Sequence, residues 1–338
     1  QLFTGRVMAF ISPVMSMVMN GIALAIYWIG AVLINKATFM EFPTLFGDMV
    51  VYMAYGMQII ASFMMLAMMF MIAPRSHVSA KRINEVLDTK ISIKDGNGVS
   101  NTQTQGTVEF KDVSFRYPDG HSNVLQNISF KINKGETDAF IGSTGCGKTS
   151  LVNLITRFYD ATSGEVLVDG ENVRNYKKEE LSRKIGYVSQ KAVLFSGDIQ
   201  SNVDFGDNDA DISAVEKAIS ISQSEEFVKL QKEGIRSYVS QGGQNFSGGQ
   251  KQRLSIARAL ARKAEIFIFD DTFSALDYKT DRLLRNALRT EMKDSTCIIV
   301  AQRIGTIIDA DQIFVIDNGE IVGHGTHKEL LNTCDTYK

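Results

Sequence analysis

A glycine-rich segment that ends in a lysine and a threonine carries the clearest chemistry in the sequence. It consists of Gly142, Ser143, Thr144, Gly145, Cys146, Gly147, Lys148 and Thr149, with Ser150 directly after it. Glycines let successive backbone N–H groups approach phosphate oxygens without a clash with Cβ atoms, and a following helix adds the positive end of its dipole. In this pattern the lysine reaches the β- and γ-phosphates of a nucleotide and the threonine hydroxyl holds Mg²⁺. The segment therefore predicts a site for MgATP.

The elements expected beside this loop are the ones that the pattern requires. An apolar strand ends at Ile141, and residues 150–158 have the pattern of a helix. A chance match to the loop is the alternative interpretation, and the order strand, loop, helix makes it less favoured. We interpret Cys146 as a small filler of the loop rather than a reactive thiol, although a helix N-terminus can lower a thiol pKa.

A pair of carboxylates follows a second apolar run. Residues 266–269 are Ile-Phe-Ile-Phe, and Asp270 and Asp271 come directly after them. A buried parallel strand that ends in a carboxylate can place that acid beside Mg²⁺. Many buried strands end in Asp, so the run alone is weak evidence. With the phosphate loop in the same domain, it predicts Asp270 as a magnesium ligand.

A second potential anion site lies between these two motifs. It consists of Ser247, Gly248, Gly249 and Gln250, followed by a helical pattern that continues to Arg262. A serine suits the N-cap of a helix, and the two glycines expose backbone N–H groups at the helix start. One nucleotide could use both sites only if the fold of one chain brought them together. The alternative is a nucleotide site shared between two chains.

Two long apolar stretches precede all of these motifs. Residues 7–34 and 49–73 contain no charged side chain, and each exceeds the roughly 20 residues that a helix needs to cross a bilayer. A buried core helix is the alternative for both, and a signal peptide is the alternative for the first; length argues against each. Arg6 and Arg75 on the outer flanks place those flanks in the cytosol. We therefore predict a multi-pass plasma-membrane protein whose soluble part is cytoplasmic.

The composition separates a membrane part from a soluble part. We expect residues 1–88 to form part of a transmembrane domain, with a cytosolic helical extension over 75–88, a polar linker over 89–106 and an α/β domain over 107–338. The net charge of −2 argues against nucleic acid as a partner. The three cysteines form no close-spaced pair and predict neither a metal cluster nor a disulfide framework. Because the chain begins with Gln1, we also expect it to be a piece of a longer polypeptide.

Taken together and in this order, the motifs resemble the C-terminal part of an ABC exporter subunit of the bacterial multidrug type. Residues 246–250 resemble the ABC signature. The resemblance implies that Tyr117 stacks on adenine, that Gln190 contacts Mg²⁺ and that Asp277 belongs to the D-loop. It also implies α-helical membrane spans followed by an α/β P-loop ABC ATPase domain with a helical subdomain at about 191–262. The two spans would be the last two of the six that the family usually has.

Two residues depart from the family pattern. Asp271 stands where the family usually has a catalytic Glu that acts as general base. Its carboxylate would lie roughly 1–1.5 Å further from the attacking water, and a misplacement of that size can cost on the order of 10²-fold in rate. Gln302 stands where a His usually contacts the γ-phosphate, and Gln cannot carry a proton. Tolerated substitutions are the alternative. We favour impaired hydrolysis because both changes fall on one ATP site.

In this family two nucleotide domains enclose two ATP molecules head to tail, each between the phosphate loop of one chain and the signature of the other. The resemblance thus implies that the weak site contains Asp271 and Gln302, and that Ser247–Gln250 completes the site of the partner. It implies ATP and Mg²⁺ as cofactors and a second exporter subunit as partner. A heterodimer is favoured, and a homodimer stays possible.

The leading interpretation is an exporter subunit that couples MgATP binding and hydrolysis to the efflux of drugs, lipids or peptides. The alternative is a regulatory nucleotide-binding subunit with little turnover of its own. The two spans disfavour a soluble ABC-type ATPase that acts on DNA. An importer is also disfavoured, because its membrane domain is commonly a separate chain. The sequence does not predict which substrate is transported.

Overall fold

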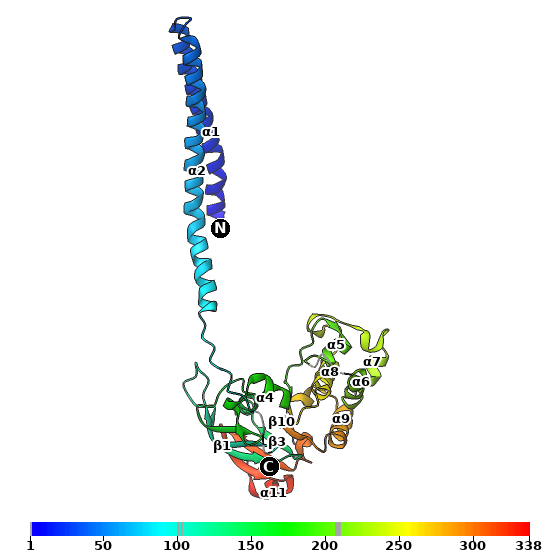
Figure 1. Ribbon diagram of the computed structural model, residues 1–338. Coiled ribbons are helices and arrows are strands. Elements are labelled where there is room, and N and C mark those ends of the chain that lie inside the picture. Colours follow the sequence, from blue (N-terminus) through cyan, green and yellow to red (C-terminus); the bar gives the residue numbers. More distant parts are fainter. Residues whose placement is uncertain (1, 100–101, 103, 207–210) are drawn as a thin grey trace. The chain divides into compact units, whose positions relative to one another are not determined.

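The computed structural model describes residues 2–99, 102, 104–206 and 211–338 (Figure 1). The chain forms two compact units, one that ends at Ile91 and one from Ser92 to Lys338. Residues 100, 101 and 103 of the predicted linker lie outside the described residues, as do residues 207–210 of the predicted helical subdomain.

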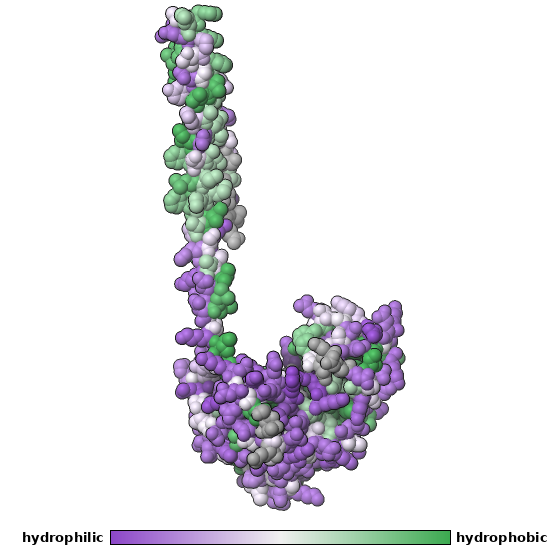
Figure 2. Space-filling view, viewed as in Figure 1, coloured by the Kyte–Doolittle hydropathy of each residue, from purple (hydrophilic) through white to green (hydrophobic). Residues whose placement is uncertain are grey.

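The first unit contains two long helices, α1 (Leu2–Lys36) and α2 (Phe42–Leu87). They pack closely: a Cβ atom on Gly30 would lie 2.5 Å from the sulfur of Met49. Most of their apolar side chains are exposed, and Figure 2 shows apolar residues gathered along both helices. Each helix is long and apolar enough to cross a membrane, judged by length and composition. The helix predicted to extend the second span continues to Leu87.

The second unit is built on two sheets. The larger has the strand order β12-β11-β3-β10-β9-β6, in which only β12 is antiparallel to its neighbour. Its strands are β3 (Thr137–Gly142), β6 (Ile185–Val188), β9 (Ile266–Asp270), β10 (Thr296–Ala301), β11 (Gln312–Asp317) and β12 (Glu320–Gly325). The four-stranded sheet has the order β2-β1-β4-β5, with β1 (Val108–Phe115), β2 (Leu125–Ile132), β4 (Ser163–Val168) and β5 (Glu171–Asn172). Every residue of β9 and β10 is buried because both faces of the parallel sheet are covered.

Helices cover the parallel sheet and form a separate group beside it (Figure 1). Those associated with the sheets are α3 (Lys148–Ile155), α4 (Lys178–Lys184), α9 (Tyr278–Glu291), α10 (Ile304–Ile307) and α11 (His327–Thr333). The separate group contains α5 (Ile199–Val203), α6 (Ile212–Ile221), α7 (Glu225–Lys229), α8 (Gly248–Ala261) and a short hairpin of β7 (Gly197–Asp198) and β8 (Tyr238–Val239). This group has an apolar core of its own.

The short 3₁₀ helices lie in the connections between these elements. They are η1 (Val173–Asn175), η2 (Gly234–Arg236), η3 (Gln241–Gly243) and η4 (Thr272–Ala275). Two further apolar clusters fill the second unit, one between the two sheets and one between the parallel sheet and the helices on its other face. Together they make the second unit a layered α/β domain.

Candidate nucleotide-binding site

The parallel strands bring the predicted site residues to one edge of the sheet. In the register of the sheet, Ile141 pairs with Ala301 and Asp270 pairs with Val300. Val188 at the end of β6 pairs with Phe269. The loops that follow β3, β6, β9 and β10 therefore leave the sheet at the same edge, which is where ligands bind in open α/β sheets.

The backbone of the phosphate loop needs its glycines for two reasons. Gly145 and Gly147 have φ of 88° and 107°, a left-handed conformation that side chains with a Cβ atom rarely adopt. At Gly142 a Cβ atom would lie 2.1 Å from the carbonyl oxygen of Ile316. Gly147 is also the N-cap of α3, and no side chain caps that helix start in the described residues. The first N–H groups of α3 are thus available to an anion.

The Lys148 side chain folds back over the loop. Its Nζ donates hydrogen bonds of 2.8 Å to the carbonyl oxygens of Gly142 and Ser143 and lies 3.5 Å from the sulfur of Cys146. Lys148 is only 7% exposed, and Cys146 is also buried. In the described residues Lys148 has no carboxylate partner within ion-pair distance. Its direct contacts are carbonyl dipoles, and the Asp270 carboxylate lies within electrostatic range, so the lysine is still able to attract phosphate.

Thr149 and Asp270 come together at the loop, 121 positions apart in the sequence. The Thr149 hydroxyl donates to Asp270 Oδ1 over 3.3 Å, and the Tyr187 hydroxyl donates to Oδ2 over 3.4 Å. Burial raises the pKa of the Asp270 carboxyl, and the two hydrogen bonds only partly oppose this. No group of three or more His, Cys, Asp or Glu side chains suited to a metal occurs in the described residues. A hydroxyl and one carboxylate nevertheless suit Mg²⁺, which usually keeps waters and phosphate oxygens as its other ligands.

Asp271 joins two loops through one oxygen atom. Its Oδ2 accepts a hydrogen bond of 3.1 Å from Gln190 Nε2 and one of 3.0 Å from Gln302 Nε2. The backbone of Asp271 is in the left-handed region, with φ of 45°, which is uncommon for a non-glycine residue and often found at functional sites. The structure thus brings the three predicted catalytic residues into direct contact.

Tyr117 also lines the cavity that contains Lys148. Its hydroxyl is 2.8 Å from the hydroxyl of Ser150. Phe115 and Tyr159 meet it edge-on, with ring centroids 4.8 and 5.0 Å away. These contacts fix the orientation of the Tyr117 ring.

A cavity of about 370 Å³ joins these groups. Among the predicted residues it is lined by Tyr117, Thr144, Gly145, Gly147, Lys148, Thr149, Ser150, Gln190, Asp270, Asp271 and Gln302. Gly142, Ser143 and Cys146 surround the lysine amine instead. The volume is in the range of small-molecule sites, which supports a nucleotide pocket.

The signature residues do not line this cavity. Ser247 is the N-cap of α8 and takes part in a capping box: its hydroxyl accepts from the N–H of Gln250 over 3.3 Å, and the Gln250 side chain accepts from the N–H of Ser247 over 2.9 Å. Ser247 and Gly248 are exposed. Asp277 is a similar N-cap on α9 and accepts from the N–H of Thr280 over 3.0 Å. The structure therefore leaves the second anion site open at the surface.

Sequence reasoning missed two residues that bear on the site. Tyr187 contacts Asp270, and its only signal was its place in the strand before Gln190. Asp138, the second residue of β3, is fully buried, and neither carboxylate oxygen has a side-chain hydrogen bond among the described residues. Burial and the nearby Glu136 and Asp311 raise the pKa of Asp138 to about 7. A lone acid within an apolar strand was the visible signal.

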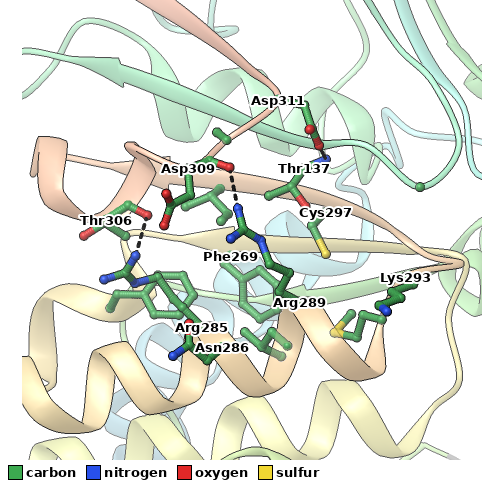
Figure 3. Close-up of a pocket in the computed structure, with 16 residues that line it drawn as sticks. Thr137, Phe269, Arg285, Asn286, Arg289, Lys293, Cys297, Thr306, Asp309 and Asp311 are labelled. Atoms are coloured by element: carbon green, nitrogen blue, oxygen red, sulfur yellow. Dashed lines mark hydrogen bonds between the residues drawn. The ribbon is translucent and has the colours of Figure 1, made fainter. Parts of the chain in front are cut away.

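A second cavity, of about 300 Å³, contains none of the predicted site residues (Figure 3). It lies between α9 and the segment formed by α10, which contains Thr306, and the residues after it, including Asp309. Its arginines are already bonded: Arg285 pairs with Asp281 on its own helix, and Arg289 donates to the carbonyl oxygen of Asp309 over 2.9 Å. The contact of Arg289 ties α9 to the segment that precedes β11.

Comparisons with known proteins agree with this geometry. Residues 125–274 match the family model of the ABC transporter. An uncharacterized ABC transporter ATP-binding protein of Mycobacterium tuberculosis is 40% identical over 341 residues, covering 99% of this chain and 57% of the relative. An ATP-dependent lipid A-core flippase of Xanthomonas oryzae pv. oryzae is 42% identical over 286 residues, covering 84% of this chain and 48% of the flippase.

A solved structure is similar as well. A bacterial Atm1-family ABC exporter with ATP bound superposes with a TM-score of 0.73 at 30% identity, over 86% of this chain and 51% of the exporter. The chain thus spans only about half the length of the proteins that it resembles.

The fold and the motif match define the class: two long apolar helices followed by an ABC-type α/β ATPase domain, as the sequence predicted. The chain is accordingly similar to ABC transporter ATP-binding proteins, and it has the apolar helices and the ATPase domain in one polypeptide.

Proposed function

We propose that the chain is a subunit of an ABC-type exporter that binds MgATP in the phosphate-loop cavity and hydrolyses it slowly there. The observation that carries the second part is the contact of Asp271 with Gln190 and Gln302. A general base must accept a proton from the attacking water. Both groups that donate hydrogen bonds to the Asp271 carboxylate are amides, which do not titrate near neutral pH, so neither can assist this proton transfer.

The other predicted residues have roles that fit their positions. Lys148 would leave the carbonyl oxygens of Gly142 and Ser143 to bind phosphate, which exchanges two neutral acceptors for a charged one. Thr149, Asp270 and Gln190 would hold Mg²⁺, which when bound neutralises part of the phosphate charge. Gln190 would then move from Asp271 toward the ion. The face of the Tyr117 ring would stack on adenine.

The membrane part of the proposal rests on α1 and α2. We propose that residues 1–88 are part of a transmembrane domain, that 89–106 link it to the nucleotide-binding domain over 107–338, and that about 191–262 form its helical subdomain. The nucleotide-binding domain would lie on the cytoplasmic side of the plasma membrane. The exposed apolar side chains of the helices suit contact with lipid or with further helices.

The proposed partner is a second, similar exporter subunit. In this chain Ser247 and Gly248 are exposed, and Ser247–Gln250 does not line the cavity. The capping box uses the N–H groups of Ser247 and Gln250, so those of Gly248 and Gly249 would bind the nucleotide of another chain. We favour a heterodimer in which the partner has Glu and His where this chain has Asp271 and Gln302. Affinity purification from the native membrane with mass spectrometry tests this. A homodimer with full ATPase activity would overturn it.

The transported substrate belongs to the classes drugs, lipids or peptides, and the flippase relative supports including lipids. A regulatory subunit without turnover is the second candidate, supported by the same Asp271 contact. Reconstitution of the complex in vesicles separates the two. Transport that needs hydrolysable ATP, and that stops when Ser247 is replaced by Ala, supports the exporter; nucleotide binding with no transport of any substrate class supports the regulatory subunit.

A further inference from the structure

The short segment Lys94–Val99, which we call the strap, is hydrogen-bonded along its length to the rest of the second unit. The backbone N–H of Gly96 donates to the carbonyl oxygen of Tyr176 over 3.1 Å, and that of Gly98 donates to the carbonyl oxygen of Asn175 over 3.0 Å. The composition of residues 89–106 is typical of a flexible linker. Part of this segment is nevertheless held in place by backbone hydrogen bonds.

Side chains secure the strap near both of its ends. Asp95 Oδ1 accepts from the backbone N–H of Lys178, the first residue of α4, over 3.0 Å. The N–H of Val99 donates to Glu180 Oε2 over 3.1 Å. Both partners lie in the first turn of α4, so the strap follows any movement of that helix start.

The glycines of the strap are required by this docking. A Cβ atom on Gly96 would lie 2.3 Å from the backbone of Asn175 and 2.4 Å from the carbonyl oxygen of Arg174. Gly98 has φ of 89°, a conformation that favours glycine. The sequence of the strap is thus fitted to the surface beneath it.

Arg157 connects the strap to the phosphate-loop helix. It follows the end of α3 closely and is only 8% exposed. Its guanidinium donates to Asp160 over 3.2 Å, to the carbonyl oxygen of Tyr176 over 3.1 Å and to the carbonyl oxygen of Lys94 over 2.7 Å. Tyr176 thus accepts from both Arg157 and Gly96, and one buried arginine ties three segments together.

The helix between Lys148 and Arg157 is suited to transmit a movement. Its 8 residues span about 12 Å, and six of them are buried, including Leu151 and Ile155. Nucleotide phosphate would bind at its first residue, and Arg157 lies just beyond its last. Along the chain, the strap leads directly back to α2. If bound nucleotide displaces α3, the Arg157 guanidinium would therefore transmit this displacement to the strap, which leads along the chain to the apolar helices.

We propose that the strap is a coupling element, and that Arg157 is the positioning residue through which nucleotide binding changes how firmly the strap is held. This rests on the proposed function, because it requires MgATP to bind at Lys148. Arg157 itself contacts no substrate in this proposal; it acts through α3.

Hydrogen exchange on the full-length protein in lipid nanodiscs tests the proposal, with and without MgATP. In the unaltered protein we expect the strap amides of Gly96 and Gly98 to be protected, and MgATP to change their exchange by about fivefold, equivalent to about 1 kcal/mol of local stability. With Arg157→Lys, MgATP affinity should stay close to that of the unaltered protein, while the exchange of the strap no longer responds to nucleotide.

Matched variants separate coupling from simple structural support. Arg174→Ala removes a neighbouring arginine that donates to the carbonyl oxygen of Ala161 and lies 3.8 Å from Asp160, the carboxylate that Arg157 also contacts. Its side chain makes no hydrogen bond to the strap in the described residues, so this variant should leave the response intact. Gly96→Val displaces the strap without altering α3, so it should abolish the response even if Arg157 variants fold poorly.

The outcomes that would overturn the proposal are distinct. Two results would overturn the coupling role alone. One is that MgATP binds to the unaltered protein but does not change the exchange of the strap amides. The other is that MgATP changes this exchange in the Arg157→Lys and Gly96→Val proteins as much as in the unaltered protein. Failure of the unaltered protein to bind MgATP would overturn the proposed function, and the coupling role with it.

Discussion

Two glycine-containing helix starts of the second unit, those of α3 and α8, differ in what occupies them. At α3 the N-cap is Gly147, no side chain caps the helix in the described residues, and the Lys148 amine lies against the loop. At α8 the N-cap is Ser247, whose hydroxyl and neighbouring Gln250 close a capping box at the exposed surface. The start of α3 is open to an anion bound in the cavity of the same chain. At the start of α8 the capping box already satisfies two of the backbone N–H groups.

This difference is consistent with two predicted anion sites that do not serve the same nucleotide. The α3 site has a positive charge and a cavity around it. The signature residues at α8 do not line that cavity, and the Lys251 amine in the first turn of α8 donates to the carbonyl oxygen of Gly242 over 3.2 Å. The α8 start therefore contributes only when another surface supplies the rest of the pocket. A helix N-terminus is worth little to a ligand until something excludes water from it.

Replacing Lys148 by Ala should have the largest effect on this comparison. Charge-assisted hydrogen bonds contribute about 1.5–3 kcal/mol each, so we expect MgATP affinity to fall by about 10²-fold. Titration with a fluorescent ATP analogue measures the change. Lys251→Ala, in the first turn of α8, is the matched control and should alter affinity by less than about twofold. Equal losses at the two lysines would remove the distinction between the sites.

Asp271→Glu combined with Gln302→His should restore proton transfer at the α3 site. The longer carboxylate and the titratable ring would raise the single-turnover rate of ATP hydrolysis by about 10- to 10²-fold. The rate is measured in the assembled complex. Each single variant should give less than the pair, because both residues share the Asp271 oxygen contact. An unchanged rate in the double variant would contradict the proposed impairment.

Ser247→Ala should lower the ATPase activity of the assembled complex by about tenfold, more than Asp271→Ala does. The loss of a cap alone costs about 1 kcal/mol of stability, so a thermal melt must accompany the assay. Thr326→Ala removes the cap of another capping box, on α11, and should leave activity unchanged. Similar losses from Ser247→Ala and Asp271→Ala would count against an asymmetric pair of sites.

The smallest effect concerns Asp138, which lies on the strand that leads to the phosphate loop. Its pKa is raised to about 7 in the folded state, so folding favours the protonated acid. This stabilisation is complete below about pH 4 and is lost as the pH rises through 7. Between pH 6 and pH 8 we expect a loss of about 1 kcal/mol.

Denaturant unfolding at several pH values measures the Asp138 contribution. Asp138→Asn should remove this part of the pH dependence. A pH profile that is the same in both proteins would exclude Asp138 as its origin.

The sequence predicted the elements of the site better than their contacts. Gly142–Thr149 and the carboxylate after β9 could be placed because a parallel sheet brings strand ends to one edge. The contact of Gln190 with Asp271 joins residues 81 positions apart, and it depends on the rotamers of both side chains. No spacing rule contains that information.

The strap shows a different limit. Its polar, glycine-containing composition is typical of a flexible linker, yet Gly96 is required by a close approach to Asn175. The sequence does not distinguish a glycine that gives a segment conformational freedom from one that lets a neighbouring backbone approach closely. Only the partner surface, built from residues far along the chain, distinguishes the two.

The hydrogen bond between Tyr117 and Ser150 has a consequence for which nucleotides the cavity accepts. The one polar atom of the Tyr117 side chain is occupied by Ser150, so the ring can offer a base only its flat face. Stacking of this kind accepts any base, since every base has a π-face. We therefore expect GTP to compete with ATP within about tenfold in a displacement titration. In a cell, the abundance of ATP rather than the shape of this pocket would then decide which nucleotide is bound.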